Sequence, residues 1–93
     1  MPTDWDVYGK VVASEYRQRV LHSVSEHPKT PTQIADEIDK HQSHVSKTLR
    51  ELVEFALVEC LNPNATKGRL YTLTDEGADI HSQLRKEGYF DGL

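Results

Sequence analysis

A group of polar and basic side chains in the middle of the sequence has the chemistry needed to bind a polyanion. The group consists of Gln42, Ser43, His44, Lys47 and Arg50, followed further along the chain by Lys67 and Arg69. Amide and hydroxyl groups both donate and accept hydrogen bonds, whereas lysine and arginine donate charge-assisted hydrogen bonds to phosphate or carboxylate oxygens. These residue types therefore suit a partner that carries both negative charge and hydrogen-bonding edges.

The basic charge of the chain is concentrated in the same region. The 93 residues include 11 basic and 15 acidic ones, a net charge of −4, which taken alone disfavours a polyanionic partner. Residues 40–69, however, hold five basic and three acidic residues, whereas residues 1–39 hold four against seven and residues 70–93 hold two against five. The middle third is therefore the part of the chain best suited to contact a nucleic acid.

The elements that must position this group begin with a strong helix-start signal at residues 30–33. Thr30 can cap the helix, Pro31 fits its first position, and the side chain of Gln33 can reach back to the cap residue. An apolar stripe of Ile34, Ala35 and Ile38 follows. The pattern predicts a helix of about two turns, after which residues 39–41 turn the chain.

A further helix is expected over about residues 42–54. Val45, Leu49 and Leu52 recur at spacings of four and three residues and form its buried side. At about 100° per residue, Ser43, Lys47, Arg50 and Glu54 fall on the opposite side, with His44 and Glu51 flanking them. Two short helices joined by a three-residue turn form a helix-turn-helix, which would expose the polar group.

The flanking segments complete a mainly α fold with a small antiparallel β-hairpin. An earlier helix is predicted from Ser14 to near His27, and a last helix is capped by Thr74 and ends before Gly88. Strand-like runs at residues 57–61 and 70–73 flank a polar loop at residues 62–69. The expected order is helix, helix, helix, strand, strand, helix, in a single domain over residues 1–93.

This order resembles the winged helix-turn-helix of prokaryotic and archaeal transcription regulators of the ArsR and MarR type. The segments that carry the resemblance, which spans about residues 14–84, are residues 30–35 (TPTQIA), 43–52 (SHVSKTLREL), 57–59 (LVE) and 68–77 (GRLYTLTDEG). Asp39 and Ala56 stand where the family often has glycine. Asp tolerates a left-handed backbone, whereas Ala56 would cost about 1 kcal/mol if it had positive φ.

The resemblance implies a transcriptional regulator that binds double-stranded DNA sequence-specifically. Residues 42–54 would be the recognition helix in the major groove, and residues 62–69 the wing on the backbone or in the minor groove. The candidate base-reading residues are Gln42, Ser43, His44 and Lys47. Arg50, Lys67 and Arg69 supply further cations, and Thr30, Thr32 and Gln33 lie at a helix N-terminus that suits a phosphate oxygen.

A homodimer is expected, because a handful of cations per subunit gives weak binding at physiological salt. The pairing surface would be the N-terminal segment 1–13, which contains Trp5 and Tyr8, or the last helix. The alternative is that the N-terminal segment packs on the last helix of its own chain. Such an interface could also hold a small effector, which the sequence does not specify.

Other classes of function have less support from the sequence. An enzyme is not expected, because there is no paired-carboxylate pattern, glycine-rich phosphate loop or nucleophile elbow. No cofactor or metal is expected: His41 and His44 supply only two ligands, and Cys60 is a lone thiol. His22, His27 and His81 are interpreted as ordinary surface or half-buried residues. With no signal-like or membrane-spanning run, a cytoplasmic protein is expected.

One alternative to DNA binding stays open at this point. Winged helices also serve as protein–protein interaction modules without direct DNA contact. The net negative charge, together with Glu51 and Glu54 on the exposed side of the third helix, suits that role.

Overall fold

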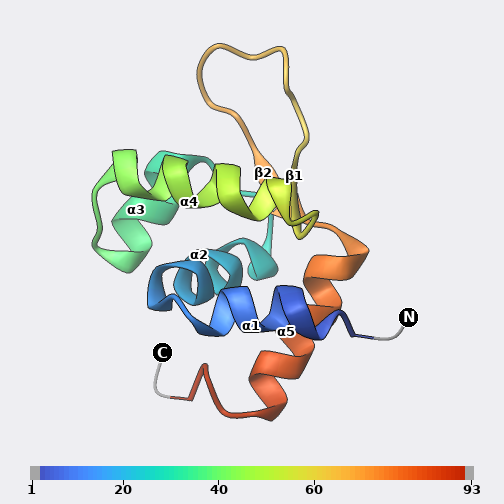
Figure 1. Ribbon diagram of the computed structural model, residues 1–93. Helices are drawn as coiled ribbons and strands as arrows, with labels where there is room; N and C mark the ends of the chain where they lie inside the picture. Colours follow the sequence, from blue (N-terminus) through green and yellow to red (C-terminus); the bar gives the residue numbers. More distant parts are fainter. Residues whose placement is uncertain (1–2, 92–93) are drawn as a thin grey trace.

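Helices form most of the molecule, and the computed structural model describes residues 3–91 (Figure 1). Its elements are α1 (Trp5–Val12), α2 (Glu15–Glu26), α3 (Pro31–Ile38), α4 (Gln42–Glu54), β1 (Val58–Cys60), β2 (Tyr71–Leu73) and α5 (Asp75–Lys86). The predicted α+β fold with one hairpin is therefore confirmed, with one addition. Helix α1 precedes the predicted elements, in a segment for which no helix was predicted. Between residues 3 and 91, no helix has the length and apolar character needed to cross a membrane.

Local hydrogen bonds define where most of the helices begin. The side chains that accept hydrogen bonds from first-turn N–H groups are Asp4 in α1, Ser14 in α2, Thr30 in α3 and Thr74 in α5. Thr30 and Gln33 form the reciprocal capping box predicted from the sequence. Helix α4 differs, because His41 at its N-cap makes no side-chain capping hydrogen bond. The N–H groups of its first turn have no side-chain cap.

Left-handed backbone ends the two helices of the helix-turn-helix. Asp39 has φ 56° at the end of α3, a left-handed conformation that Asp tolerates. Ala56 has φ 61° after α4, so the strain of about 1 kcal/mol applies there. Two hydrogen bonds offset it: Leu57 N–H donates to Leu52 O and Ala56 N–H donates to Val53 O, both at 3.0 Å. This is a Schellman motif.

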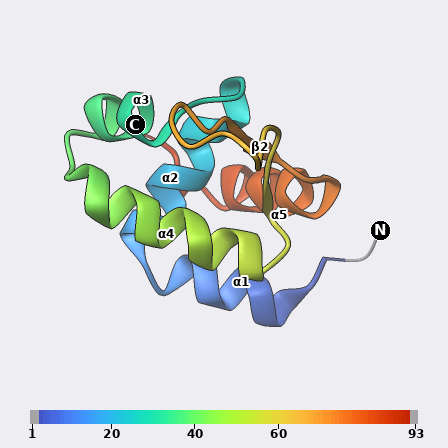
Figure 2. The same cartoon turned by 90° about the horizontal axis from the view of Figure 1, so that it is seen from above.

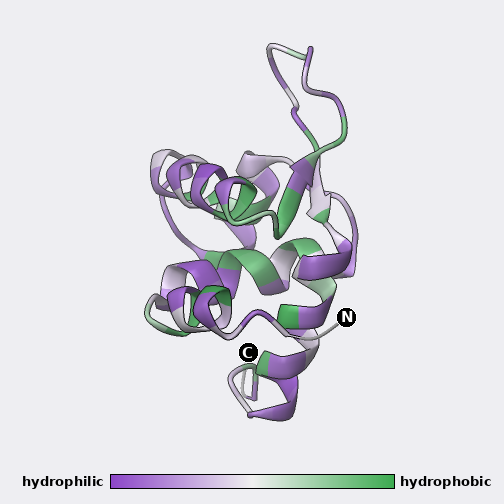
Figure 3. Ribbon diagram, turned by 45° about the vertical axis from the view of Figure 1, so that its right-hand side comes forward, coloured by the Kyte–Doolittle hydropathy of each residue, from purple (hydrophilic) through white to green (hydrophobic). Residues whose placement is uncertain are grey.

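Helix α2 lies at the centre of the core and contacts α1, α3, α4, α5 and β2. Its residues Val20 and Leu21 are fully buried, together with Ile34 of α3 and Leu52 of α4. Apolar parts of the ribbon gather in the middle of the molecule, whereas most of the wing loop is hydrophilic (Figure 3). The core therefore holds α4 by its apolar side and leaves its polar side exposed to solvent.

The hairpin is antiparallel and slightly shorter than predicted, with Val58 opposite Leu73 and Cys60 opposite Tyr71. One more backbone hydrogen bond continues the pairing of the two strands toward the loop: Leu61 N–H donates to Leu70 O (2.8 Å). On the other edge of β2, Lys29 in the α2–α3 linker forms an isolated antiparallel bridge with Tyr71. The wing loop, residues 62–69, projects from this small sheet away from the helices (Figure 1).

The interpretation of His81 as a surface or half-buried residue is wrong, because only 6% of it is exposed. Its ring belongs to a three-ring cluster, with centroids 5.2 Å from His22 of α2 and 4.8 Å from Phe90, and His22 and Phe90 are themselves 4.3 Å apart. His81 Nε2 and His22 Nδ1 are 3.0 Å apart and share a hydrogen bond. Burial, and then the charges of His22 and Arg85, lower the pKa of His81 from 6.5 to about 4.

This pKa shift predicts a loss of stability in mild acid. Between the two pKa values the unfolded chain binds a proton that the folded chain excludes, so the free energy of unfolding falls as pH drops from 6.5 to about 4. The full shift corresponds to about 3 kcal/mol. Urea unfolding measured across this pH range should show a steeper fall for the wild type than for His81→Phe. Parallel profiles for the two proteins would contradict this assignment.

Candidate nucleic-acid interface

Helix α4 lies at the surface of the molecule (Figure 2). Val45, Leu49 and Leu52 are buried, as predicted. The exposed residues of its first three turns include Gln42, Ser43, His44, Lys47 and Arg50. The wing projects from the same end of the molecule as α4 (Figure 1). The two elements are therefore placed so that one partner could contact both.

A groove with a volume of about 530 Å³ separates α4 from the wing and reaches the start of α3. Its lining consists of Thr30, Pro31, Thr32, Gln42, Ser46, Arg50, Thr66, Lys67, Gly68, Arg69 and Tyr71. Three of these residues, Arg50, Lys67 and Arg69, are cations, and none of the lining residues carries a carboxylate. Three segments far apart in the sequence thus contribute to one cationic groove, although the chain as a whole is acidic.

Ser46 and Tyr71 line the groove, although neither was among the candidate site residues. Ser46 lies between Gln42 and Arg50 at four-residue spacing, so all three share the side of α4 that faces the wing. This spacing could have identified Ser46 had the wing's position been known. Tyr71 is partly buried and packs against the core beneath the wing, and it also lines the groove.

The other predicted residues lie outside the groove. Ser43 and Lys47 are exposed on the outer side of α4. Gln33 belongs to the capping box, in which its side-chain oxygen accepts a hydrogen bond from Thr30 N–H (2.9 Å) and its own N–H donates to the Thr30 hydroxyl (3.2 Å). Each of these side-chain oxygens therefore accepts one hydrogen bond, and the Thr30 hydroxyl proton and the Gln33 amide N–H groups can still donate to a phosphate oxygen.

His44 lies on the side of α4 that faces α2. Its Nδ1 lies 3.3 Å from the Tyr16 hydroxyl, and the two rings meet edge to face with centroids 5.5 Å apart. The ammonium of Lys40 lies 5.7 Å from the centre of the Tyr16 ring. His44 is therefore separated from the groove by the width of the helix.

Neither glutamate of α4 is part of the groove lining. Glu51 Oε1 lies 3.3 Å from Arg17 Nε, on the side of α4 that faces α2. The Arg17 guanidinium also stacks on Phe55 (5.2 Å to the ring centroid) and donates to Lys10 O (2.7 Å). Glu54 is exposed but is not part of the groove lining. Glu51 thus lies on the opposite flank of α4 from the groove, whereas Glu54 is one turn beyond Arg50, next to the groove but outside its lining.

Hydrogen bonds within the wing hold its backbone and the side chain of Arg69 in place. Asn62 bridges the loop: its Oδ1 accepts from Leu70 N–H (2.7 Å) and its Nδ2 donates to Gly68 O (3.1 Å). Arg69 Nε donates to Ala65 O (2.9 Å), which leaves the outer nitrogens of the guanidinium for a partner. Gly68 adopts φ 66° between the two basic residues, a conformation that glycine reaches without steric cost.

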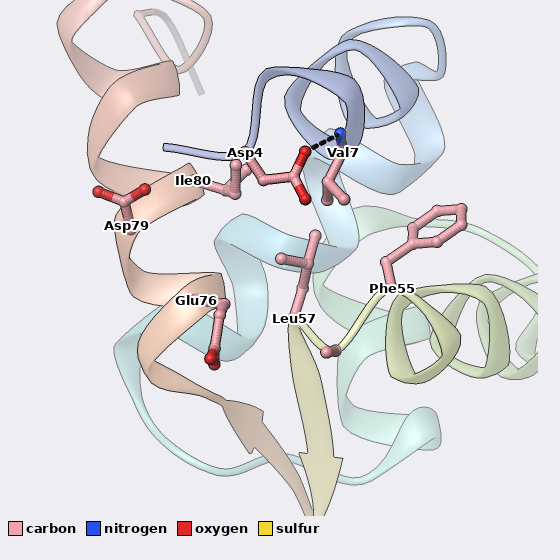
Figure 4. A pocket seen from close by; sticks show the side chains of 8 residues that line it. Asp4, Val7, Phe55, Leu57, Glu76, Asp79 and Ile80 are labelled. Carbon is pink, nitrogen blue, oxygen red and sulfur yellow. Dashed lines mark hydrogen bonds between the residues drawn. The ribbon is translucent and has the colours of Figure 1, made fainter. Parts of the chain in front are cut away.

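A second hollow, of about 150 Å³, lies between the start of α1, the turn after α4 and α5 (Figure 4). Val7, Leu57 and Ile80 contribute apolar surface, and the carboxylates of Asp4, Glu76 and Asp79 lie around it. Asp4 also caps α1 by accepting a hydrogen bond from Val7 N–H (3.2 Å). The three carboxylates give the hollow a negative charge, which excludes it as a binding site for a polyanion.

The helix-turn-helix, the hairpin and the groove between them define a winged helix-turn-helix domain. A family model described as a helix-turn-helix domain matches residues 12–60, and the chain belongs to this family. A search of curated proteins found no significant match.

Solved structures share the fold. The reduced form of MarR from E. coli superposes with a TM-score of 0.74 at 27% identity, over 92% of this chain and 65% of that one. Apo MarR from E. coli gives 0.72 at 28%, over 85% and 61%. A MarR family transcription regulator gives 0.73 at 23%, over 82% and 52%. The predicted winged helix-turn-helix of the MarR type is thus confirmed, and the aligned region spans about half to two thirds of these proteins.

Proposed function

We propose that the chain is a transcription regulator that binds double-stranded DNA sequence-specifically through α4 and the wing. The observation that carries this proposal is the groove, which brings Arg50, Lys67 and Arg69 together with no carboxylate in its lining. This groove of the protein lies next to the exposed polar side of α4, a helix that can enter the major groove of DNA. Such a regulator acts in the cytoplasm, where prokaryotic DNA is found.

One strand of the duplex backbone would lie in the groove. The three cations would donate charge-assisted hydrogen bonds to phosphate oxygens, and the Thr30 and Thr32 hydroxyls would add neutral ones. The start of α4 has neither a capping side chain nor an acidic residue in its first turn. The partial positive charge of its N-terminus is therefore available to a phosphate as well.

Base reading is assigned to the N-terminal half of α4. Gln42 can pair two-fold with adenine and Lys47 with guanine, and Ser43 can bond either, each good pair contributing about 1–3 kcal/mol of discrimination. His44 is engaged with Tyr16, so we assign it to the helix flank rather than to the base-reading set. Gln33, which completes the α3 cap, is assigned to the backbone.

We further propose that the regulator binds as a homodimer. Each domain offers only a few cations, and a two-fold pair doubles the phosphate contacts. Trp5 is 60% exposed in α1 and meets Tyr8 edge to face at 5.2 Å, and Tyr89 after α5 is 39% exposed. The pairing surface would include these aromatic residues, even though α1 also packs on α2 of its own chain.

Selection of bound duplexes from a random pool tests the function. We expect an enriched motif with two copies related by two-fold symmetry, as a dimer requires. The log of the affinity for that motif should fall linearly with the log of the salt concentration, and Lys47→Ala should flatten the slope by about one unit per domain. A pool that shows no enrichment, or binding that does not change with salt, would refute DNA recognition.

A protein-interaction module is the second candidate function. Val53 on α4 and Leu61 at the base of the wing are 42% and 50% exposed, and the net charge is −4. Exposed apolar side chains of this kind are typical of protein interfaces. Salt-independent binding to a protein, with no affinity for any duplex, would favour this candidate.

A further inference from the structure

Lys29 is a buried lysine in the linker between α2 and α3, with only 4% of its surface exposed. Its ammonium donates to Ser23 Oγ (3.3 Å) and pairs with Glu37, and it lies 3.7 Å from Glu26 Oε1. Although burial acts in the opposite direction, the hydrogen bond and charge of Lys29 lower the pKa of Glu37. The side chain thus joins α2 to α3 through a fully engaged charge.

The backbone of the same residue is joined to the root of the wing. Lys29 N–H donates to Tyr71 O (3.1 Å), and Tyr71 N–H donates to Lys29 O (2.9 Å). Tyr71 begins β2 directly after the wing loop, two residues beyond Arg69. Lys29 therefore connects three parts of the molecule: α2, α3 and the strand from which the wing emerges.

Lys29 lies next to the point where the α3 side and the wing side of the cationic groove adjoin. Thr30, the next residue, begins the α3 wall, and Tyr71 ends the wing wall. Lysine is seldom buried, and a buried ion pair can often be replaced by apolar residues without loss of stability. Stability alone therefore does not explain why a lysine is buried here. Fixing the wing at a defined angle to α3 requires directional hydrogen bonds and ion pairs, which an apolar side chain cannot make.

We propose that Lys29 is a positioning residue that fixes the wing relative to α3, so that Lys67 and Arg69 reach the same duplex as α4. The proposal rests on the DNA-binding function proposed above. Lys29 itself touches no DNA, because its ammonium is enclosed by Ser23, Glu26 and Glu37. Its loss should act on binding only through the wing.

The test compares the wild type with Lys29→Met/Glu37→Gln, which removes one positive and one negative charge and keeps the net charge constant. If the wing loses its position, the slope of log affinity against log salt should flatten by one to two units, since each lost phosphate contact contributes about 0.9. A purely structural role would lower the folded fraction and shift affinity equally at every salt concentration. Parallel lines for the two proteins would therefore overturn the proposal.

A double-mutant cycle with Lys67→Gln/Arg69→Gln gives a second readout. Removing the wing charges should reduce affinity several-fold less in the Lys29→Met/Glu37→Gln background than in the wild type, because their contacts are already lost. Equal reductions in the two backgrounds would contradict coupling. Lys29→Arg, which keeps the charge, should restore most of the salt slope.

Amide hydrogen exchange separates failure of this proposal from failure of the proposed function, because it needs no DNA. The Tyr71 amide, which donates to Lys29 O, should exchange faster in Lys29→Met/Glu37→Gln, and the amides of the buried α2 residues should be unchanged. Unchanged exchange at Tyr71 would overturn the positioning role even if the wild type binds DNA. If the double variant does not fold, Glu37→Gln alone, which removes the ion pair with α3 but changes the net charge, is tested by hydrogen exchange at Tyr71, a readout that does not depend on DNA.

Discussion

Replacing Gly77 by alanine should destabilise the domain by more than about 4 kcal/mol, a change that few single substitutions cause. A Cβ at this position would lie 1.9 Å from Leu57 O and 2.9 Å from Leu57 C, and both atoms belong to the backbone. No rotamer change can relieve such an overlap. Leu57 O also accepts a hydrogen bond from Thr74 N–H (3.0 Å), so moving it would break the link between β1 and the cap of α5.

Gly9→Ala provides the matched control for this substitution. Gly9 also lies in a helix, but a Cβ there would have no atom within 4 Å. The higher helix propensity of alanine should then stabilise the domain by up to about 1 kcal/mol. Urea unfolding followed by circular dichroism measures both variants. If Gly77→Ala unfolded at nearly the wild-type urea concentration, the close approach of α5 to Leu57 would be wrong.

Removing the two wing charges with Lys67→Gln/Arg69→Gln should weaken DNA binding about thirtyfold per domain at 0.15 M salt. The estimate follows from two lost phosphate contacts, each of which contributes about 0.9 to the slope of log affinity against log salt. The slope itself should flatten by about two units. Fluorescence anisotropy with a labelled duplex over a range of salt concentrations measures both quantities.

The control for the wing variant removes the same charge elsewhere. Arg85→Gln/Lys86→Gln changes the two basic residues in the last turn of α5, in an element that contributes nothing to the groove lining. Its salt slope should stay close to that of the wild type. Equal flattening by the two variants would mean that binding depends on total charge rather than on the groove.

The sequence predicted those elements whose signals are local. The capping box at Thr30 and Gln33 depends only on neighbouring residues, and it is present in the structure. Asp39 adopts the left-handed backbone that Asp tolerates. Helix α1 was missed although Asp4 provides a cap. A helix of eight residues is marginal by itself and needs tertiary packing, which it receives where Val11 enters the core.

The candidate site was predicted in part, because its geometry depends on contacts between distant segments. The periodicity of α4 identified which side is buried, but not which flank faces the wing. Ser46 was therefore missed, and the contact of His44 with Tyr16, on the flank across the helix from the groove-lining Gln42 and Arg50, was not foreseen. The burial of Lys29 and His81 likewise depends on how α2 packs against α3 and α5, which no local pattern encodes.

We propose above all that one duplex contacts α4 and the wing together. Backbone amide shifts of the ¹⁵N-labelled protein, recorded while the selected duplex is added, test it most directly. We expect the largest changes at Thr30 and Thr32, along residues 42–50 and along residues 66–69, with little change at the hollow shown in Figure 4. Changes concentrated in α1 and α5, with α4 and the wing unaffected, would contradict the claim.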